Sequence, residues 1–225
     1  MIVVVGSRHD PVAAALVEAW EGAALCSAED LTRPGWAWSS TAPASSRWVV
    51  DGAVVEDRLV TGVFVRRSRV YADELSSTHP DDRAYLAAES HAFLVFVLAT
   101  TRATVVSQAA DGTLGDEGLG PERWMPAATG LGMQVAPLRL ASRRVAARRL
   151  TTSVVEVVAD QAFGDVPARS AARAVALVEA LGLRWAAVVF DGRHRVVAVT
   201  GARSPGAEAT AALARLLTAP SPLRS

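Results

Sequence analysis

The first 26 residues alternate between a strand pattern and a helix pattern. Residues 1–6 hold four consecutive aliphatic side chains before Gly6, which predicts a buried strand. Pro11 stands where a helix can begin, and residues 12–20 carry apolar side chains at helical spacing. Residues 23–26 predict the next short strand. Strand, helix and strand at this length predict a right-handed parallel unit of an α/β sheet.

The rest of the chain predicts two regions. An N-terminal, mostly parallel sheet with flanking helices is expected in residues 1–140, and a smaller C-terminal α+β region in residues 151–220. Further strands are predicted at residues 59–65, 103–106, 135–140 and 154–158, and helices at residues 81–101, 121–129, 167–181 and 206–217. Two hairpins are predicted, 47–50 with 53–55 around Asp51-Gly52, and 185–190 with 195–199.

The composition is that of a globular protein, since 51% of residues are hydrophobic and 20% are charged. A balance of 23 basic and 23 acidic residues argues against nucleic acid or an anionic membrane as a partner. The longest apolar run, residues 92–100, is far shorter than the roughly 20 residues of a spanning helix. One cysteine, Cys26, and no visible signal-peptide pattern lead us to expect a cytoplasmic protein.

The chain contains no lysine, because all 23 basic residues are arginine. Schiff-base catalysis needs an amine nucleophile, and a Walker-type loop needs a lysine at the β- and γ-phosphates. Arginine replaces neither a base nor a nucleophile, because its guanidinium stays protonated. The abundance of Ala, Arg, Gly and Val also indicates a GC-rich genome, in which lysine is rare. Whatever the cause of the missing lysines, the chain has no amine side chain for Schiff-base catalysis or for a Walker-type phosphate loop.

The basic cluster Arg66, Arg67 and Arg69 follows a predicted strand. Ligands of open α/β sheets gather outside the carboxyl ends of the strands, where guanidinium groups suit a carboxylate or a phosphate. Alternatively, these arginines pair with acidic residues just downstream, namely Glu74, Asp81 or Asp82. Tyr85 and Glu89 lie four residues apart on one face of the predicted helix, where they could supply hydrogen bonds or proton transfer.

Other signals are weak, and we predict no catalytic residue, metal site or cofactor. The glycine-rich residues 112–120 lack Gly-Lys-Ser/Thr and carry acidic side chains. The four histidines show no metal-ligand spacing, and no G-x-S-x-G elbow is present. Cys26 has no evident base partner and is expected to be a small buried residue. Residues 143–149, with four arginines, are expected to form a solvated face or to contact an acidic partner.

Residues 62–138 contain GVFVRRSRVYADEL, HPDDRAYLAAESHAFLVFVLA, ATVVSQ and PERWMPAATGLGMQVAPL. A strand ending in arginine, an acidic, tyrosine-containing helix start, an aromatic helix body and a Trp-containing helix follow one another here. This order resembles the N-terminal domain of ATP-grasp ligases of the ribosomal-protein-glutamate-ligase-like and graspetide type. Residues 168–206 resemble the last segment of the same ligases, in which a helix leads to a hairpin carrying an acidic metal ligand.

The chain departs from that family in three respects. The family ends its second hairpin strand with a Glu-x-Asn motif that holds Mg²⁺, whereas residues 197–201 read Val-Ala-Val-Thr-Gly. The family clamps the nucleotide phosphates with lysines, which this chain lacks. Between residues 138 and 154 there is room for little more than one strand and an arginine-rich turn. We therefore expect the central nucleotide-binding subdomain to be missing or drastically shortened.

These features favour a degenerate, non-catalytic ATP-grasp-like binding or accessory protein, without ATP-dependent activity of its own. Its expected partner is a ligase or a peptide substrate in peptide or natural-product modification. The alternative is a small, atypical ligase or transferase in which Arg66 and Arg67 hold an anionic group beside Tyr85 and Glu89. A homodimeric structural module is a third hypothesis, suggested by the alanine-rich C-terminal helices.

Overall fold

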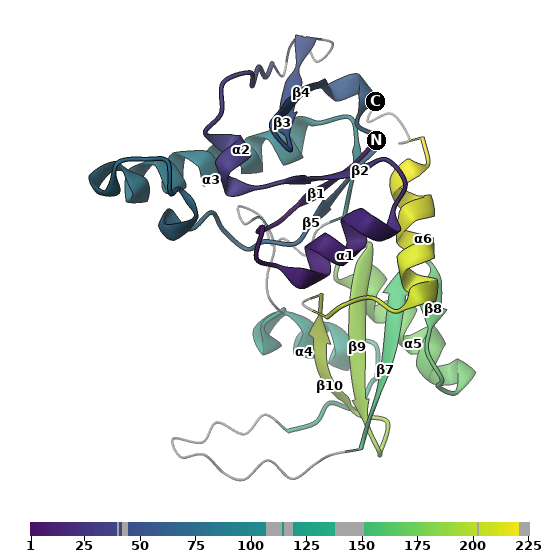
Figure 1. Cartoon of the computed structure of the whole chain (residues 1–225). Helices are drawn as coiled ribbons and strands as arrows, with labels where there is room; N and C mark the ends of the chain where they lie inside the picture. Colours follow the sequence, from purple (N-terminus) through teal and green to yellow (C-terminus); the bar gives the residue numbers. More distant parts are fainter. Residues whose placement is uncertain are drawn as a thin grey trace. The chain divides into compact units, whose positions relative to one another are not determined.

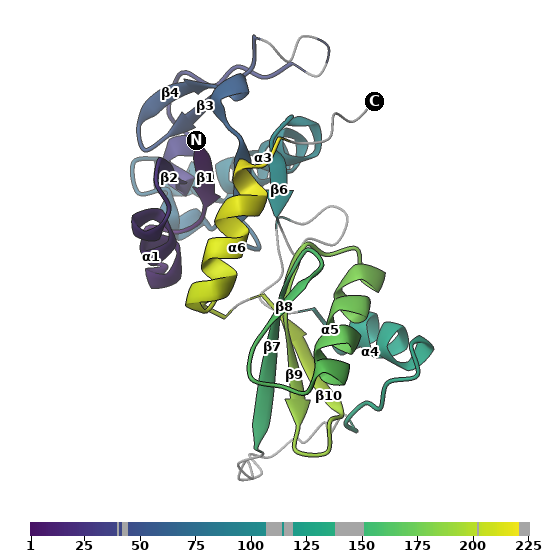
Figure 2. The same ribbon diagram turned by 90° about the vertical axis from the view of Figure 1, so that its right-hand side faces the viewer.

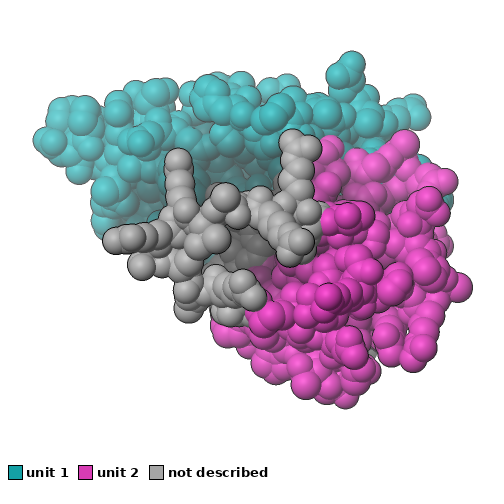
Figure 3. All heavy atoms as spheres, turned by 90° about the horizontal axis from the view of Figure 1, so that it is seen from below, with its two compact units in different colours: residues 1–117, 210–225 teal, residues 118–209 magenta. Residues whose placement is uncertain are grey.

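A computed structural model describes residues 1–39, 41, 45–106, 114, 119–137, 151–201 and 203–220. The chain forms two compact units, coloured separately in Figure 3. Unit 1 comprises residues 1–117 and 210–225, and unit 2 comprises residues 118–209. The predicted boundary between residues 140 and 151 lies almost wholly outside the described residues, and the predicted division of the chain there stays a prediction.

Unit 1 is built on a four-stranded parallel sheet (Figure 1). Its strands, in spatial order, are β2 (Ala23–Cys26), β1 (Ile2–Val5), β5 (Gly62–Val65) and β6 (Thr104–Val106). Every residue of β1 and β5 is buried, as expected for central strands of a parallel sheet covered on both faces. The parallel β1–β2 unit predicted from the first 26 residues is confirmed.

Helices cover both faces of this sheet (Figures 1 and 2). On one face, α3 (Arg83–Thr100) contributes Leu94 and Val97 to the core around Val3 and Val63. The opposite face carries α1 (Pro11–Ala19) and α6 (Ala207–Thr218). At the end of α1, the Trp20 ring packs edge-on against Phe64, and its Nε1 donates to the Thr210 carbonyl of α6 at 3.0 Å. Segments about 190 residues apart in sequence therefore share one face of the sheet.

The predicted hairpin forms, with β3 (Arg47–Val50) antiparallel to β4 (Ala53–Glu56). Asp51 and Gly52 both adopt positive φ, 48° and 75°, the combination that a tight Asp-Gly turn requires. The indole of Trp48 is fully buried in contact with the Trp36 and Trp38 rings. The hairpin thus closes the part of the unit 1 core that the helices leave open.

The predicted strand over residues 59–65 begins only at Gly62. Residues Asp57–Leu59 instead form a 3₁₀ turn, η2, because Asp57 is buried and accepts two hydrogen bonds. Its Oδ1 accepts from Trp48 Nε1 and from Thr101 Oγ1, both at 2.8 Å. The buried Asp57 carboxylate keeps residues 57–59 in the turn and out of an extended conformation. The pairing with β1 therefore starts at Gly62, three residues after the predicted start at residue 59.

Unit 2 contains a four-stranded antiparallel sheet with helices on one face (Figure 2). Its elements are α4 (Pro121–Gly130), β7 (Thr152–Val158), β8 (Gln161–Phe163), α5 (Ala168–Ala180), β9 (Trp185–Asp191) and β10 (Val196–Thr200). The strand order is β10-β9-β7-β8, and α4 and α5 bury Trp124, Ala174 and Leu177 against it. The predicted fold class, a parallel sheet with flanking helices plus a smaller α+β region, is confirmed.

Several short elements have no counterpart in the sequence-based prediction. These are α2 (Ala28–Leu31), η3 (Ala72–Glu74) and β8. The helix predicted at residues 81–101 is α3, and its first predicted residues belong to a 3₁₀ turn, η4 (Pro80–Asp82). The strand predicted at residues 135–140 is reduced to one parallel bridge between Val135 and Val196, and residues 138–140 lie outside the described part of the chain. Most of the glycine-rich residues 112–120 and all of residues 143–149 also lie outside it. No described helix has the length and hydropathy needed to cross a membrane.

The contact between β5 and α6 gives a stability prediction. A Cβ added to Gly62 would lie 2.7 Å from the Leu217 Cα, so Gly62→Val should force the helix away from the strand. We expect a loss of about 1–3 kcal/mol in the free energy of unfolding, measured by urea denaturation. Gly130→Ala is the matched control, because a Cβ there meets nothing within 4 Å. Equal stability of the Gly62→Val variant and the wild-type chain would contradict the close approach.

Candidate functional site

The carboxyl ends of β1 and β5 lie at the point where the chain connections of unit 1 diverge. From β1 the chain passes through α1 to β2 on one side, whereas from β5 it passes through α3 to β6 on the other. Loops that leave neighbouring strands in opposite directions leave a crevice between them, and ligands of open α/β sheets bind there. The loops in question contain Ser7–Asp10 and the predicted anion-binding residues Arg66 and Arg67.

Arg66 ties these two loops together. Its Nε donates to Asp10 Oδ2 at 3.1 Å, and its Nη2 lies 3.1 Å from the same oxygen. Asp10 also caps α1, because its Oδ1 accepts from the Val12 amide at 2.9 Å. Arg66 thereby fixes the start of α1 against the end of β5, a positioning role for this predicted site residue.

Arg67 is more deeply buried, with 4% of its side chain exposed. Its Nη2 donates to Glu74 Oε1 at 2.7 Å, while Glu74 Oε2 accepts from the Tyr71 amide at 3.2 Å. Of the acidic partners that the sequence left open for this cluster, Glu74 is the partner of Arg67. Arg67 Nε and Nη1 are buried and have no hydrogen-bond partner among the described residues. This guanidinium is therefore charge-paired but only partly hydrogen-bonded.

A cavity of about 120 Å³, lined in part by Glu74, opens beside this ion pair. Three segments line it, the loop after β1, the junction of β2 and α2, and the turn η3 with the residues after it. The lining residues are Ser7, Arg8, His9, Ser27, Ala28, Glu29, Asp73, Glu74 and Ser76. The cavity thus lies at the carboxyl edge of the sheet, in the region that the sequence predicted for an anion.

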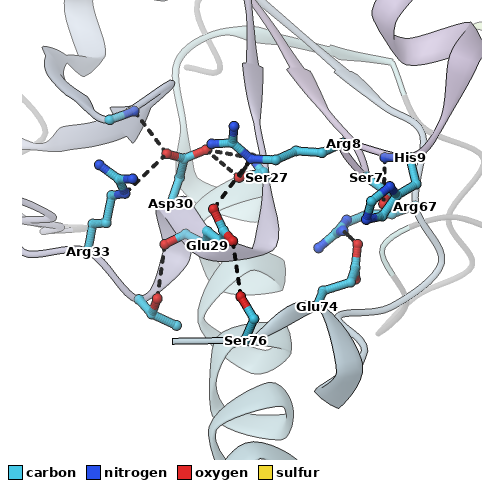
Figure 4. Close-up of polar contacts among 12 residues, drawn as sticks. Ser7, Arg8, His9, Ser27, Glu29, Asp30, Arg33, Arg67, Glu74 and Ser76 are labelled. Carbon is cyan, nitrogen blue, oxygen red and sulfur yellow. Dashed lines mark hydrogen bonds and ion pairs between the residues drawn. The ribbon is translucent and has the colours of Figure 1, made fainter. Parts of the chain in front are cut away.

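Arg8 reaches from the loop after β1 to the β2–α2 junction (Figure 4). Its Nε donates to Ser27 Oγ at 3.3 Å and lies 3.5 Å from Glu29 Oε2. Glu29 Oε1 in turn accepts from Ser76 Oγ at 3.4 Å. These contacts join residues far apart in sequence, and no sequence pattern predicted them. The available signal was the position of residues 7–10 directly after the first strand.

Asp30 holds the β2–α2 junction in place beneath the cavity. This fully buried carboxylate accepts from the amide and the hydroxyl of Ser27, at 2.8 and 2.7 Å, and from the Gly52 amide at 2.9 Å. Its charge is used within the fold, so Asp30 acts as a support for Ser27 and for the β3–β4 turn.

Tyr85 and Glu89, the other two predicted binding residues, lie on α3. Both are exposed, and Tyr85 has 70% of its surface accessible. The predicted set therefore divides into a half-buried and a buried arginine at the sheet edge, Arg66 and Arg67, and two exposed residues on a helix. A joint role for all four stays a prediction.

No protein-family model matches the chain, and neither does any curated protein. Solved structures do match. They include the macrocyclase MdnC bound with precursor peptide MdnA from Microcystis aeruginosa (TM-score 0.66, 11% identity, covering 96% of this chain and 98% of that chain). A Chryseobacterium gregarium RiPP-associated ATP-grasp ligase in complex with ADP and a leader and core peptide has TM-score 0.62 and 8% identity, covering 96% of each chain. The ATP-grasp ligase PsnB complexed with a minimal precursor has TM-score 0.59 and 15% identity, covering 96% and 97%.

The chain has an ATP-grasp-like fold. This agrees with the resemblance found in its sequence, and at these identities the likeness concerns the fold. The predicted shortening of the central subdomain falls between residues 138 and 154, most of which lie outside the described residues.

The ATP-grasp-like resemblance places an acidic metal ligand in the β9–β10 hairpin, where Asp191 is the one acidic residue. The structure shows Asp191 engaged within the hairpin and 4% exposed. Its Oδ2 accepts from Arg195 Nη2 at 2.7 Å and Nε at 2.9 Å, and its Oδ1 accepts from the Arg193 and Arg195 amides. The described residues contain no group of three or more His, Cys, Asp or Glu that could hold a metal ion.

The same contacts set the ionisation of Asp191. Burial opposes its charged form, but the hydrogen bonds and the charge of Arg195, with the Arg193 amide, outweigh burial and lower the pKa of this carboxyl. Within an ATP-grasp-like fold, this carboxylate stabilises its own turn and has little capacity left for a metal.

Asp191→Asn should destabilise the chain at neutral pH by about 1.5–3 kcal/mol, because it removes the charge-assisted bonds to Arg195. The folded-state pKa of Asp191 is lowered, so its contribution is fully present above the ordinary aspartate pKa. The contribution is lost as the pH falls through the folded value. Urea denaturation at neutral and strongly acidic pH should therefore show a stability difference that shrinks in acid. A difference independent of pH would contradict this account.

Cys26 should be chemically inert in the folded chain. Burial raises the pKa of its thiol to about 12, the Asp30 charge adds to the increase, and Arg67 partly offsets it. Alkylation by iodoacetamide near pH 8 should be at least about a hundredfold slower in the folded chain than in urea, because the thiolate is the reactive form. Mass spectrometry over time measures both rates, and similar rates would show that Cys26 is accessible and ionisable.

Proposed function

We propose that this chain is a peptide-binding accessory protein of peptide modification that retains an ATP-grasp-like fold but does not activate carboxylates with ATP. The fold supports the first half of this proposal. The similar proteins MdnC and PsnB are described in complexes with precursor peptides, and the Chryseobacterium ligase in a complex with ADP and a leader and core peptide. Because these proteins of similar fold are described with precursor peptides, the fold favours a peptide, or the ligase that acts on one, as the partner of this chain.

The composition of the β9–β10 hairpin carries the second half. Strand β10 has the sequence Val-Val-Ala-Val-Thr, without a carboxylate or an amide side chain at the positions where the resemblance implies Mg²⁺ ligands. The one hairpin carboxylate, Asp191, is occupied by Arg195. No lysine exists elsewhere in the sequence to clamp phosphates. Phosphoryl transfer depends on the metal and on cations placed around the phosphates, and the chain lacks the usual form of both.

A second candidate function rests on Arg67. A buried guanidinium with two nitrogens unbonded among the described residues could hold the anionic group of a substrate in an atypical ligase or transferase. Such an enzyme would need an activated donor, and its turnover would depend on Arg67. The accessory protein would bind the same group without turnover. Measured turnover separates the two.

Isothermal titration of the purified full-length chain with Mg-ATP should give no binding at micromolar affinity, and a coupled assay should detect no release of ADP or phosphate. Both measurements should be repeated with acidic peptides present, because a substrate can complete a nucleotide site. Folding of the sample is verified by circular dichroism. Micromolar binding of Mg-ATP, or turnover that exceeds the buffer background, would refute the proposal.

A further inference from the structure

We propose that the cavity beside Arg67 is an oxyanion site in which a carboxylate or phosphate group of a ligand replaces Glu74 as the partner of Arg67. The resting structure then holds Glu74 as an internal counter-ion. The inference rests on the proposed function only for the peptide origin of the oxyanion. The site itself follows from the contacts of unit 1.

The first step concerns the hydrogen-bonding capacity of Arg67. A guanidinium offers five N–H donors in a planar fork, and burial without acceptors costs free energy. Arg67 is 4% exposed, only its Nη2 donates to Glu74, and its Nε and Nη1 have no partner in the described part of the chain. The Arg67 guanidinium therefore binds one carboxylate oxygen of Glu74, although its fork of donors can bind two. The unmet donors favour a further acceptor at this place.

The second step concerns the hold on Glu74. It ends η3, a 3₁₀ turn of three residues, and 17% of its side chain is exposed. Its carboxylate is held by Arg67 and by the Tyr71 amide. The backbone of the next residue is anchored independently, since Leu75 is fully buried in the unit 1 core. Glu74 can therefore rotate away from Arg67 while the turn stays in place.

The third step concerns charge, and it explains why the ligand replaces Glu74 and does not bind in addition to it. Arg8 and three carboxylates, those of Glu29, Asp73 and Glu74, line the cavity, and Arg67 lies behind Glu74 as its ion-pair partner. With Arg67 included, two positive and three negative side chains repel an additional anion. When Glu74 leaves, the incoming oxyanion takes over its charge, and the balance is unchanged. The ligand also gains the donors of Arg67 that Glu74 does not use.

The fourth step concerns size. A cavity of about 120 Å³ is well below the roughly 300–1,000 Å³ of sites that enclose drug-sized molecules. It suits a single carboxylate-bearing side chain or a phosphate group, with the rest of the ligand outside. The Ser7 hydroxyl on the cavity wall accepts from the His9 amide and can donate its own proton to either shape. The shared chemistry is an oxyanion, and the source is decided by titration.

The test uses the full chain and two probes, N-acetyl-aspartate amide for a side-chain carboxylate and inorganic phosphate. Glu74→Gln removes the resident charge and keeps the side-chain shape, so it should tighten binding of the preferred probe about tenfold in isothermal titration. Glu18→Gln is the matched control, because it removes the same charge from an exposed residue of α1 that does not line the cavity. It should change the affinity less than about threefold.

A second readout identifies the group that binds. In ¹⁵N-labelled protein, the Arg67 Nε–H resonance should shift on titration and saturate with the calorimetric isotherm. The double variant Arg67→Gln with Glu74→Gln removes both charges of the pair together, which preserves neutrality in the fold. The spectrum of this double variant should lack the Arg67 Nε–H resonance, which identifies the resonance in the wild-type spectrum. The double variant should also no longer bind the probe.

The probe that binds more tightly shows whether the oxyanion of the ligand is a carboxylate or a phosphate. Equal affinities in Glu74→Gln and wild type, an unshifted Nε–H resonance, or binding by neither probe at millimolar concentration would each overturn the proposal. These titrations contain no nucleotide. ATP turnover would therefore refute the proposed function and leave the oxyanion site standing, and failure of the titrations would do the reverse.

Discussion

The parallel sheet of unit 1 must be covered on both faces, and most other features of the unit follow from that constraint. Its central strands β1 and β5 present apolar side chains in both directions, so neither face can remain in water. One face receives α3 and the Trp48 hairpin, and the other receives α1 together with α6, from the far end of the chain. At Gly62 the strand and α6 come so close that a side chain would collide with the helix. With both faces occupied, the strand ends are left as the place for polar groups.

The polar groups at the carboxyl ends of these strands are neutralised by partners within the same unit. Arg66 pairs with Asp10, Arg67 with Glu74, and Arg8 with Glu29. A buried arginine is strongly destabilising without a counter-ion, so a fold that places cations here must also supply anions. The pairs differ in completeness. Asp10 receives Arg66 at two positions and also caps α1, whereas Arg67 keeps Nε and Nη1 without partners among the described residues. This difference in hydrogen bonding separates Arg66–Asp10, a structural ion pair, from Arg67, a candidate binding group.

Much of the fold could be predicted from local sequence patterns. The aliphatic run at the start and the Asp51-Gly52 turn have direct physical meanings, and the structure confirms both. What could not be predicted depends on contacts between distant residues. The turn at Asp57 forms because Trp48 and Thr101 donate to its carboxylate, and the choice of Glu74 over Asp81 for Arg67 is made by the path of the chain after β5. The cavity likewise joins Ser27 and Ser76, which no periodic pattern connects.

An arginine-only chain differs from a lysine-containing one most where a cation is buried. A buried lysine can lose its proton, and that adjustable pKa makes lysine a general base or a nucleophile. A buried arginine keeps its charge, so the surrounding structure has to provide acceptors, as Glu74 does for Arg67. A permanent charge at a strand end recognises oxyanions by fixed geometry and takes no part in proton transfer. The basic residues of this ATP-grasp-like fold are therefore suited to hold anions and not to exchange protons.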